Sequence, residues 1–170
     1  ITGQVIDQET NAPVPNLLIS AGGNQAFTAS DGSFQINDVV AGVHNLVIYS
    51  MDGAYETFQQ GALVAEGANT PVIVYLERRP TTNVRFEVTL PRDHHEELPL
   101  RFISNLSNLG NAYAELSSGS AGSPVNYPTL TKISRNRYSI DLELPVGLHL
   151  RYKYSFGDGF WNTELSNEGY

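Results

Sequence analysis

The sequence predicts an all-β protein built from two tandem β-sandwiches. Short runs of alternating apolar and polar residues recur along the 170 residues, and glycine, proline, asparagine and aspartate separate them. No stretch shows the apolar spacing of an amphipathic helix. Many short strands between turn residues are typical of sandwich folds, so we expect sheets packed face to face in each half of the chain.

The boundary between the two sandwiches falls at Arg78-Arg79-Pro80. Pro80 lacks the amide hydrogen that a strand ladder needs, and a new alternating run begins just after it. The charge also changes there: residues 1–80 carry two basic and eight acidic side chains, and residues 81–170 carry eight basic and ten acidic ones. We therefore expect one domain over residues 1–79 and a second over residues 82–170.

The first half contains five runs that predict strands, separated by turn sequences such as Ser30-Asp31-Gly32-Ser33 and Met51-Asp52-Gly53. Residues 70–76 are apolar on both faces, which indicates a central strand covered on both sides. The predicted strands cover residues 1–6, 16–21, 33–39, 42–50 and 70–78.

The second half alternates more regularly. Residues 83–90 and 137–144 each predict a strand with one apolar and one solvated face. Residues 148–156 put Leu150, Tyr152 and Tyr154 on one face, and Arg151 and Lys153 on the other. Residues 34–49 and 138–154 also resemble each other, which indicates either a repeated unit or the general likeness of β-hairpins.

Composition excludes several kinds of function. The chain has no cysteine, so disulfides, zinc–thiolate sites and cysteine nucleophiles are absent. A net charge of −8 argues against a nucleic-acid partner, and no apolar run is long enough for a membrane span. The run from His94 to Glu97 lacks metal-ligand spacing, so we expect a charged loop and no metal. With no nucleophile elbow or phosphate loop, we predict neither an enzyme nor a cofactor.

The first half resembles the carboxypeptidase regulatory-like, transthyretin-related domains. The resemblance covers residues 1–79 and rests on Gly3-Gln4-Val5, Asp31-Gly32-Ser33-Phe34 and Gly42-Val43-His44. It implies a stalk or accessory module of a secreted or surface bacterial protein. We therefore expect an extracellular or cell-surface location, and a segment of a longer protein with neighbouring domains as partners.

The second half resembles starch-binding domains of the CBM20 type. The resemblance rests on VRFEVTLPRDHHEELPLRFISNLSNLG, RYSIDLELPVGLHLRYKY and GFWNTELSNEGY. Together the two resemblances imply two tandem prealbumin-like or Ig-like β-sandwiches. The second also implies a site in which Trp161 stacks on a sugar ring while Lys153 and Asn167 bond its hydroxyls. Asn162 stands where the family has a carboxylate, and Tyr113 lies beside Ala112, where the family has its other tryptophan.

Two functions remain open at this level. Phe160 and Trp161 are neighbours on a predicted strand, so their rings should face opposite sides of the sheet. An exposed Trp161 favours a non-catalytic carbohydrate-binding module whose partner is a polysaccharide such as an α-glucan. A buried Trp161, together with the missing second tryptophan, favours a structural spacer without a ligand.

Overall fold

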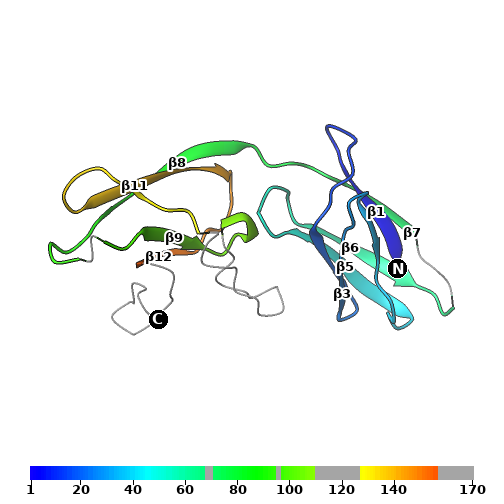
Figure 1. The fold of residues 1–170 in the computed structure, drawn as a ribbon. Helices are drawn as coiled ribbons and strands as arrows, with labels where there is room; N and C mark the ends of the chain where they lie inside the picture. The colour runs from blue at the N-terminus through cyan, green and yellow to red at the C-terminus, as the bar shows by residue number, and fades with distance from the viewer. Residues whose placement is uncertain (68–70, 95–96, 110–126, 157–170) are drawn as a thin grey trace. The chain divides into compact units, whose positions relative to one another are not determined.

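The computed structural model describes residues 1–67, 71–94, 97–109 and 127–156. The chain folds into two compact units, Ile1–Pro80 and Thr81–Tyr170 (Figure 1). The predicted all-β class is confirmed: in the described ranges, strands are joined by turns, and the one helical segment is the 3-10 turn η1 (Ser107–Leu109). None of the described residues forms a helix with the length and apolar composition that crossing a membrane requires.

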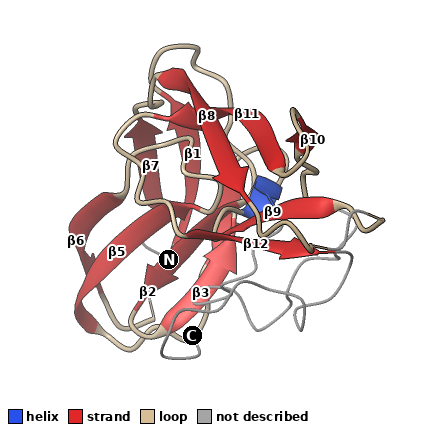
Figure 2. Cartoon of the chain, turned by 90° about the vertical axis from the view of Figure 1, so that its left-hand side faces the viewer, coloured by secondary structure: helices blue, strands red, loops and turns tan. Residues whose placement is uncertain are grey.

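The first unit contains two sheets, whose strands are drawn in Figure 2. In the smaller sheet, β1 (Thr2–Asp7) lies between β4 (Ser33–Gln35) and β7 (Pro71–Leu76). It runs antiparallel to β4 and parallel to β7. The larger sheet is antiparallel, in the order β3 (Asn24–Phe27), β2 (Leu17–Ala21), β5 (Gly42–Ser50), β6 (Phe58–Val64).

The core of the first unit consists of alternate side chains of these strands. Leu17 and Ile19 of β2 and Leu46 and Ile48 of β5 are all buried, as period-2 alternation requires. The strand predicted over 42–50 is confirmed with its bounds. The remaining buried members of this core are Val5, Val14, Ala21, Phe34, Ile36, Ala62, Val74 and Leu76.

The prediction that residues 70–76 form a central strand covered on both faces is wrong. Among the strands that the structure describes, β7 pairs only with β1, which places it at the edge of its sheet. Val74 and Leu76 point into the core, while the side chains of Ile73 and Tyr75 are 64 % and 54 % exposed. Apolar side chains on both faces do not by themselves show that both faces are covered, because an exposed apolar residue costs little when it stands singly.

Two other strand predictions need correction. The run predicted over 33–39 forms a strand only over Ser33–Gln35, and further along the backbone of Asp38 adopts the left-handed region with φ of 56°. Strands β3 and β6 were not predicted, since their polar and glycine-containing sequences lack a clear apolar alternation.

The position of Gly3 near the start of the first unit requires a residue without a side chain. It pairs with Phe34 of β4 and Val72 of β7. A Cβ atom at Gly3 would lie 2.3 Å from the carbonyl oxygen of Val72 and 2.7 Å from the Phe34 ring. A glycine within a strand often marks such a close approach.

We expect Gly3→Ala to lower the free energy of unfolding of the first unit by about 2 kcal/mol, because the methyl group must push the β1 and β7 backbones apart. Equilibrium unfolding in urea checks this. Gly61→Ala is the matched control, since a Cβ on this strand glycine has no atom within 4 Å. Equal losses for the two variants would contradict the explanation.

The second unit has two antiparallel sheets. β11 (Arg137–Pro145) lies between β8 (Thr81–Thr89) and β10 (Thr131–Lys132), and β9 (Leu100–Ser104) pairs with β12 (Tyr152–Phe156). Their inner faces enclose a core whose buried members are Leu100, Phe102, Leu130 and Tyr138.

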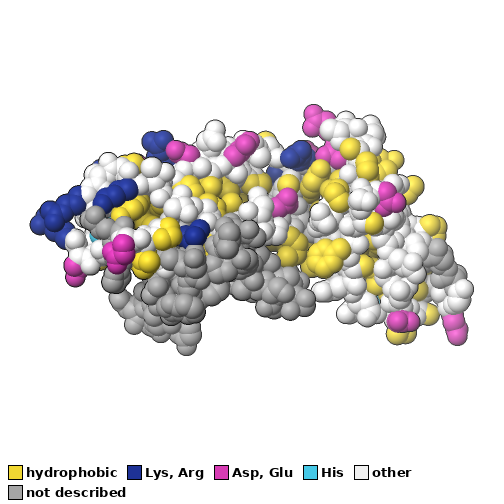
Figure 3. All heavy atoms as spheres, in the orientation of Figure 1, with side chains coloured by type: hydrophobic (Ala, Val, Ile, Leu, Met, Phe, Trp, Pro, Cys, Tyr) yellow, Lys and Arg dark blue, Asp and Glu magenta, His cyan; other side chains and the backbone are white. Residues whose placement is uncertain are grey.

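The prediction of one apolar and one solvated face in β8 and β11 is confirmed. Phe86 and Ile140 face each other across the ladder and pack on the core. The opposite face carries ion pairs, and Figure 3 shows basic and acidic side chains side by side there. Arg85 Nε donates to Asp141 Oδ1 at 2.8 Å, and Arg137 donates to Glu87 at 2.6 Å.

Candidate functional site

Of the five residues predicted to bind carbohydrate, Lys153 is the one that the structure describes. Tyr113, Trp161, Asn162 and Asn167 lie outside the described residues. The part of the candidate site that can be described is Lys153 and its neighbours on β12 and β9.

Lys153 lies on β12, where the antiparallel register sets it opposite Ile103 of β9. The alternation predicted for this segment holds over the strand: Tyr154 and Phe156 pack on the core of the second unit. Since successive strand residues point to opposite faces, Lys153 and Ser155 project from the face away from that core. The five-residue ladder with β9 fixes the backbone on which the Lys153 side chain stands.

The face around Lys153 combines buried and cationic side chains. Ile103 is only 1 % exposed and Ser155 is buried, whereas Lys153 is half-buried. On the same face, Arg101 donates from Nη1 to the carbonyl oxygen of Tyr127 at 3.1 Å. The burial of Ile103 and Ser155 shows that this face is partly covered, and Lys153 contributes to it an ammonium group, which can donate up to three hydrogen bonds.

Tyr152, at the start of β12, is an aromatic side chain whose exposure the sequence did not predict. It points to the core side, as its place in the alternation requires, but its ring is 46 % exposed. The ring stacks on Phe102 with centroids 5.2 Å apart and meets the edge of Phe86 at 5.0 Å. Its position as the first residue of the strand explains its exposure, because core cover ends there.

His94 lies in the segment between β8 and β9, where a charged loop was predicted, and it also packs against the second unit. Its Nε2 lies 2.8 Å from the hydroxyl of Tyr138, and its Nδ1 lies 2.7 Å from the carbonyl oxygen of Pro91. The ring stacks on Phe156 with centroids 6.1 Å apart. Within the described ranges, no three histidine, aspartate or glutamate side chains gather to hold a metal ion.

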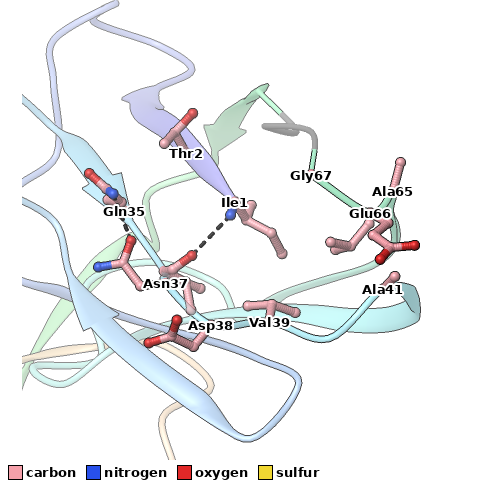
Figure 4. Close-up of a pocket in the computed structure, with 12 residues that line it drawn as sticks. Ile1, Thr2, Gln35, Asn37, Asp38, Val39, Ala41, Ala65, Glu66 and Gly67 are labelled. Carbon is pink, nitrogen blue, oxygen red and sulfur yellow. Dashed lines mark hydrogen bonds between the residues drawn. The ribbon is translucent and has the colours of Figure 1, made fainter.

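In the first unit, a cavity of about 460 Å³ opens between the start of β1, the segment after β4 and the segment after β6 (Figure 4). The backbone nitrogen of Ile1 donates to the Ile36 carbonyl at 2.9 Å, and Gln35 Nε2 donates to Asn37 Oδ1 at 2.6 Å. The charged side chains that line it are Asp38 and Glu66. Its backbone and side-chain amide donors already bond to these carbonyl oxygens, and the described residues that line it include neither a nucleophile paired with a base nor an aromatic ring for stacking a sugar.

Asp7 and Tyr55 form the most perturbed ionisable pair in the first unit. The buried carboxylate of Asp7 accepts from the amides of Thr10 at 2.8 Å and Glu9 at 3.0 Å, and from the Tyr55 hydroxyl at 2.8 Å. The Thr10 amide above all, then the Tyr55 hydroxyl, lowers the pKa of Asp7. Burial, and then the bond to Asp7, raises the pKa of Tyr55 to about 12. The hydrogen bond between Asp7 and Tyr55 links β1 to the segment before β6, so the pair stabilises the fold.

Comparison with known proteins agrees with this description of the first unit. Residues 1–77 match the family model of the carboxypeptidase regulatory-like domain. The resemblance stated from Gly3-Gln4-Val5 and the Asp31-Gly32 turn is therefore supported for that half. The starch-binding resemblance of residues 82–170 stays a prediction. No curated protein matches the chain.

Two solved structures match the chain at low sequence identity. One is a streptococcal ancillary pilin, with 12 % identity and a TM-score of 0.48, covering 92 % of this chain and 52 % of the pilin. The chain thus spans about half the length of that protein. The other is a candidate carbohydrate-binding protein of Bacteroides uniformis, with 12 % identity and a TM-score of 0.36, covering 99 % of this chain and 90 % of that one.

Proposed function

We propose that the chain is a non-catalytic module whose second unit binds carbohydrate, with an α-glucan as the ligand class. The observation that supports this proposal is the position of the half-buried Lys153 on the face of the β9–β12 ladder that points away from the core of the second unit. A cationic donor on a rigid strand can bond sugar hydroxyls without first losing backbone freedom, and pre-organisation of this kind favours binding.

The proposed site adds four residues from the sequence resemblance. Trp161 and Tyr113 provide rings for the aliphatic faces of successive glucose units, which lose little by leaving water for a π surface. Asn167 and Asn162 join Lys153 in bonding hydroxyl groups. The proposal also includes a location outside the cell or on the bacterial surface, with the module joined to other domains of a longer protein.

A titration of tryptophan fluorescence with maltoheptaose and β-cyclodextrin tests this function. Trp161 is the sole tryptophan, so the signal reports the proposed ring. We expect a saturable change that is at least about tenfold weaker in Lys153→Ala, the loss that follows from removing about 1.4 kcal/mol of binding free energy. Lys132→Ala is the matched control, because Lys132 is exposed on β10, in the other sheet of the second unit. A flat response of the wild-type protein would contradict carbohydrate binding by this site.

The second candidate is a structural spacer, and the ionic contacts favour it. Asp7 and Tyr55 hold the first unit together, while Arg85–Asp141 and Arg137–Glu87 bridge neighbouring strands of the second. These charged groups serve the fold and leave no described pair poised for chemistry. A flat titration with tryptophan emission already at short wavelength would support the spacer and set aside the sugar site.

A further inference from the structure

The outer face of the larger sheet in the first unit carries two aromatic side chains in one row. Leu17 and Ile19 of β2 belong to the core, so Leu18 between them projects from the opposite face of the sheet. Leu18 pairs with Phe27 of β3 on one side and with Tyr49 of β5 on the other. The three side chains therefore form a row that crosses the strands, with an aromatic ring at each end.

This row offers apolar surface to a ligand. Phe27 is 55 % exposed and Tyr49 is half-buried, whereas Leu18 is only 4 % exposed. An aromatic ring is well suited to the aliphatic C–H face of a pyranose, which loses little when it leaves water for a π surface. The row thus has two stacking positions and an aliphatic side chain between them.

The spacing of the row matches that of an extended sugar chain. Neighbouring strands lie about 4.8 Å apart, which is close to the repeat of one unit in an extended β-1,4-linked glucan. Strand β2 separates Phe27 from Tyr49, so their backbones are about 10 Å apart, or two such repeats. Alternate units of this glucan turn the same face to one side. Two units of like orientation can therefore meet the two rings, with the intervening unit over Leu18.

A second row, parallel to the first, supplies hydrogen-bonding groups. It lies two residues further along the strands, about 7 Å away, and consists of Gln25, Ser20, Val47 and Gln59, which pair in this order across all four strands. Within the described part of the chain, the side chains of Gln25, Ser20 and Gln59 make no hydrogen bond. An amide both donates and accepts, as a sugar hydroxyl does, so this row complements the hydroxyl groups along one edge of the sugar chain.

The smaller sheet of the same unit shows that the fold can use its outward amides. Gln4 Nε2 donates to the carbonyl oxygen of Asp31 at 2.9 Å, and Gln35 Nε2 donates to Asn37 Oδ1 at 2.6 Å. These two amides bond to neighbouring segments of the unit. The two glutamines of the larger sheet have no such role, so their amides are available to a ligand.

We propose that this face binds a β-1,4-linked glucan, whose chain runs across the strands with its sugar rings over Phe27, Leu18 and Tyr49. The hydroxyl groups along one edge of the glucan bond to Gln25 and Gln59. The strand ladder holds all of these residues in place before binding, so little backbone freedom is lost. The site lies in the first unit and does not rest on the α-glucan site proposed for the second.

Heteronuclear NMR of the 170-residue chain during a titration with cellohexaose tests this site and locates it. We expect saturable shifts of amide signals from β2, β3 and β5, with a dissociation constant of about 1 mM or tighter. Signals of the second unit should stay in place, which separates this site from a site there. Phe27→Ala should weaken binding at least about tenfold, and the exposure of Phe27 means that its loss leaves the core intact.

Tyr75→Ala is the matched control, because Tyr75 is an aromatic residue that is 54 % exposed on β7, in the other sheet. This variant should bind cellohexaose like wild type. Maltohexaose should bind this face at least about tenfold more weakly than cellohexaose, since a coiled α-1,4-linked chain does not follow the strand spacing. Three results would each overturn the proposal: no shifts in the first unit up to about 5 mM cellohexaose, equal affinities of Phe27→Ala and Tyr75→Ala, or equal binding of the two sugars.

Discussion

Replacing Phe102 by alanine is expected to lower the free energy of unfolding of the second unit by about 4 kcal/mol, the range for a phenylalanine removed from a packed core. Its side chain is 0 % exposed. The ring lies 4.7 Å from Phe86, 5.2 Å from Tyr152 and 6.1 Å from Tyr154 between centroids, so it joins the two sheets of the unit. Its loss leaves a cavity between β8 and β9 that backbone pairing prevents from closing.

Scanning calorimetry can follow this change, because the two units are expected to give separate transitions. Phe102→Ala should lower the transition of the second unit and leave that of the first unit in place. Ile133→Ala is the control, since Ile133 is half-exposed in the same unit and should cost less than about 1 kcal/mol. A loss of equal size at both positions would mean that Phe102 does not organise the core as described.

Replacing Asp7 by alanine is expected to cost the first unit about 3 kcal/mol at neutral pH. The substitution leaves the amides of Glu9 and Thr10 and the hydroxyl of Tyr55 without their acceptor in a buried place. Asp7→Asn keeps one carbonyl oxygen for the amides and should lose less. Glu9→Ala, at the exposed neighbouring position, should be nearly neutral, and urea unfolding of the three variants measures the differences.

The same bonds predict how the stability of the first unit varies with pH. The pKa of Asp7 is lower in the folded state than in the unfolded chain. Its contribution is therefore complete above the unfolded pKa of about 4 and is lost as the pH falls through the lower, folded value. The difference in unfolding free energy between wild type and Asp7→Ala should shrink as the pH drops below about 4. A difference that stays constant down to about pH 2 would contradict this origin.

The contribution of Tyr55 to stability changes with pH in the opposite direction. Its folded pKa is raised to about 12, so its neutral form contributes stability that is complete below the unfolded value of about 10 and is lost as the pH rises through about 12. The wild-type protein should lose more stability than Tyr55→Phe between about pH 10 and 12. Parallel losses in the two proteins would show that the phenol is not held by Asp7 and burial.

The sequence predicted strands best where one face is solvated. β8 and β11 alternate strictly, and their inner side chains are those that the alternation selects. The same reasoning failed for β7, because a run that is apolar on both faces is compatible with an edge strand as well as with a central one. What distinguishes the two is the presence of a neighbouring strand, which depends on contacts far along the chain.

The candidate site was predictable only in part. The alternation that places Tyr154 and Phe156 on the core side was predicted, whereas the pairing of β12 with β9 was not. The half-exposure of Tyr152 and the inward turn of His94 were not predictable, since both depend on where the core ends. The sequence identified Gly3 as a characteristic residue of the domain, but it did not show why glycine is required there. The approach of the Val72 carbonyl that requires glycine comes from a strand nearly 70 residues later.

The parallel pairing of β1 with β7 has a mechanical consequence. These are the first and last strands of the first unit, and six residue pairs join them, from Thr2 with Pro71 to Asp7 with Leu76. Because the strands run in the same direction, the chain enters the unit at one end of the ladder and leaves at the other. Tension between the two ends therefore pulls the strands past each other and loads all of their hydrogen bonds at once. Such a shear arrangement resists force far better than a ladder that unzips one bond at a time.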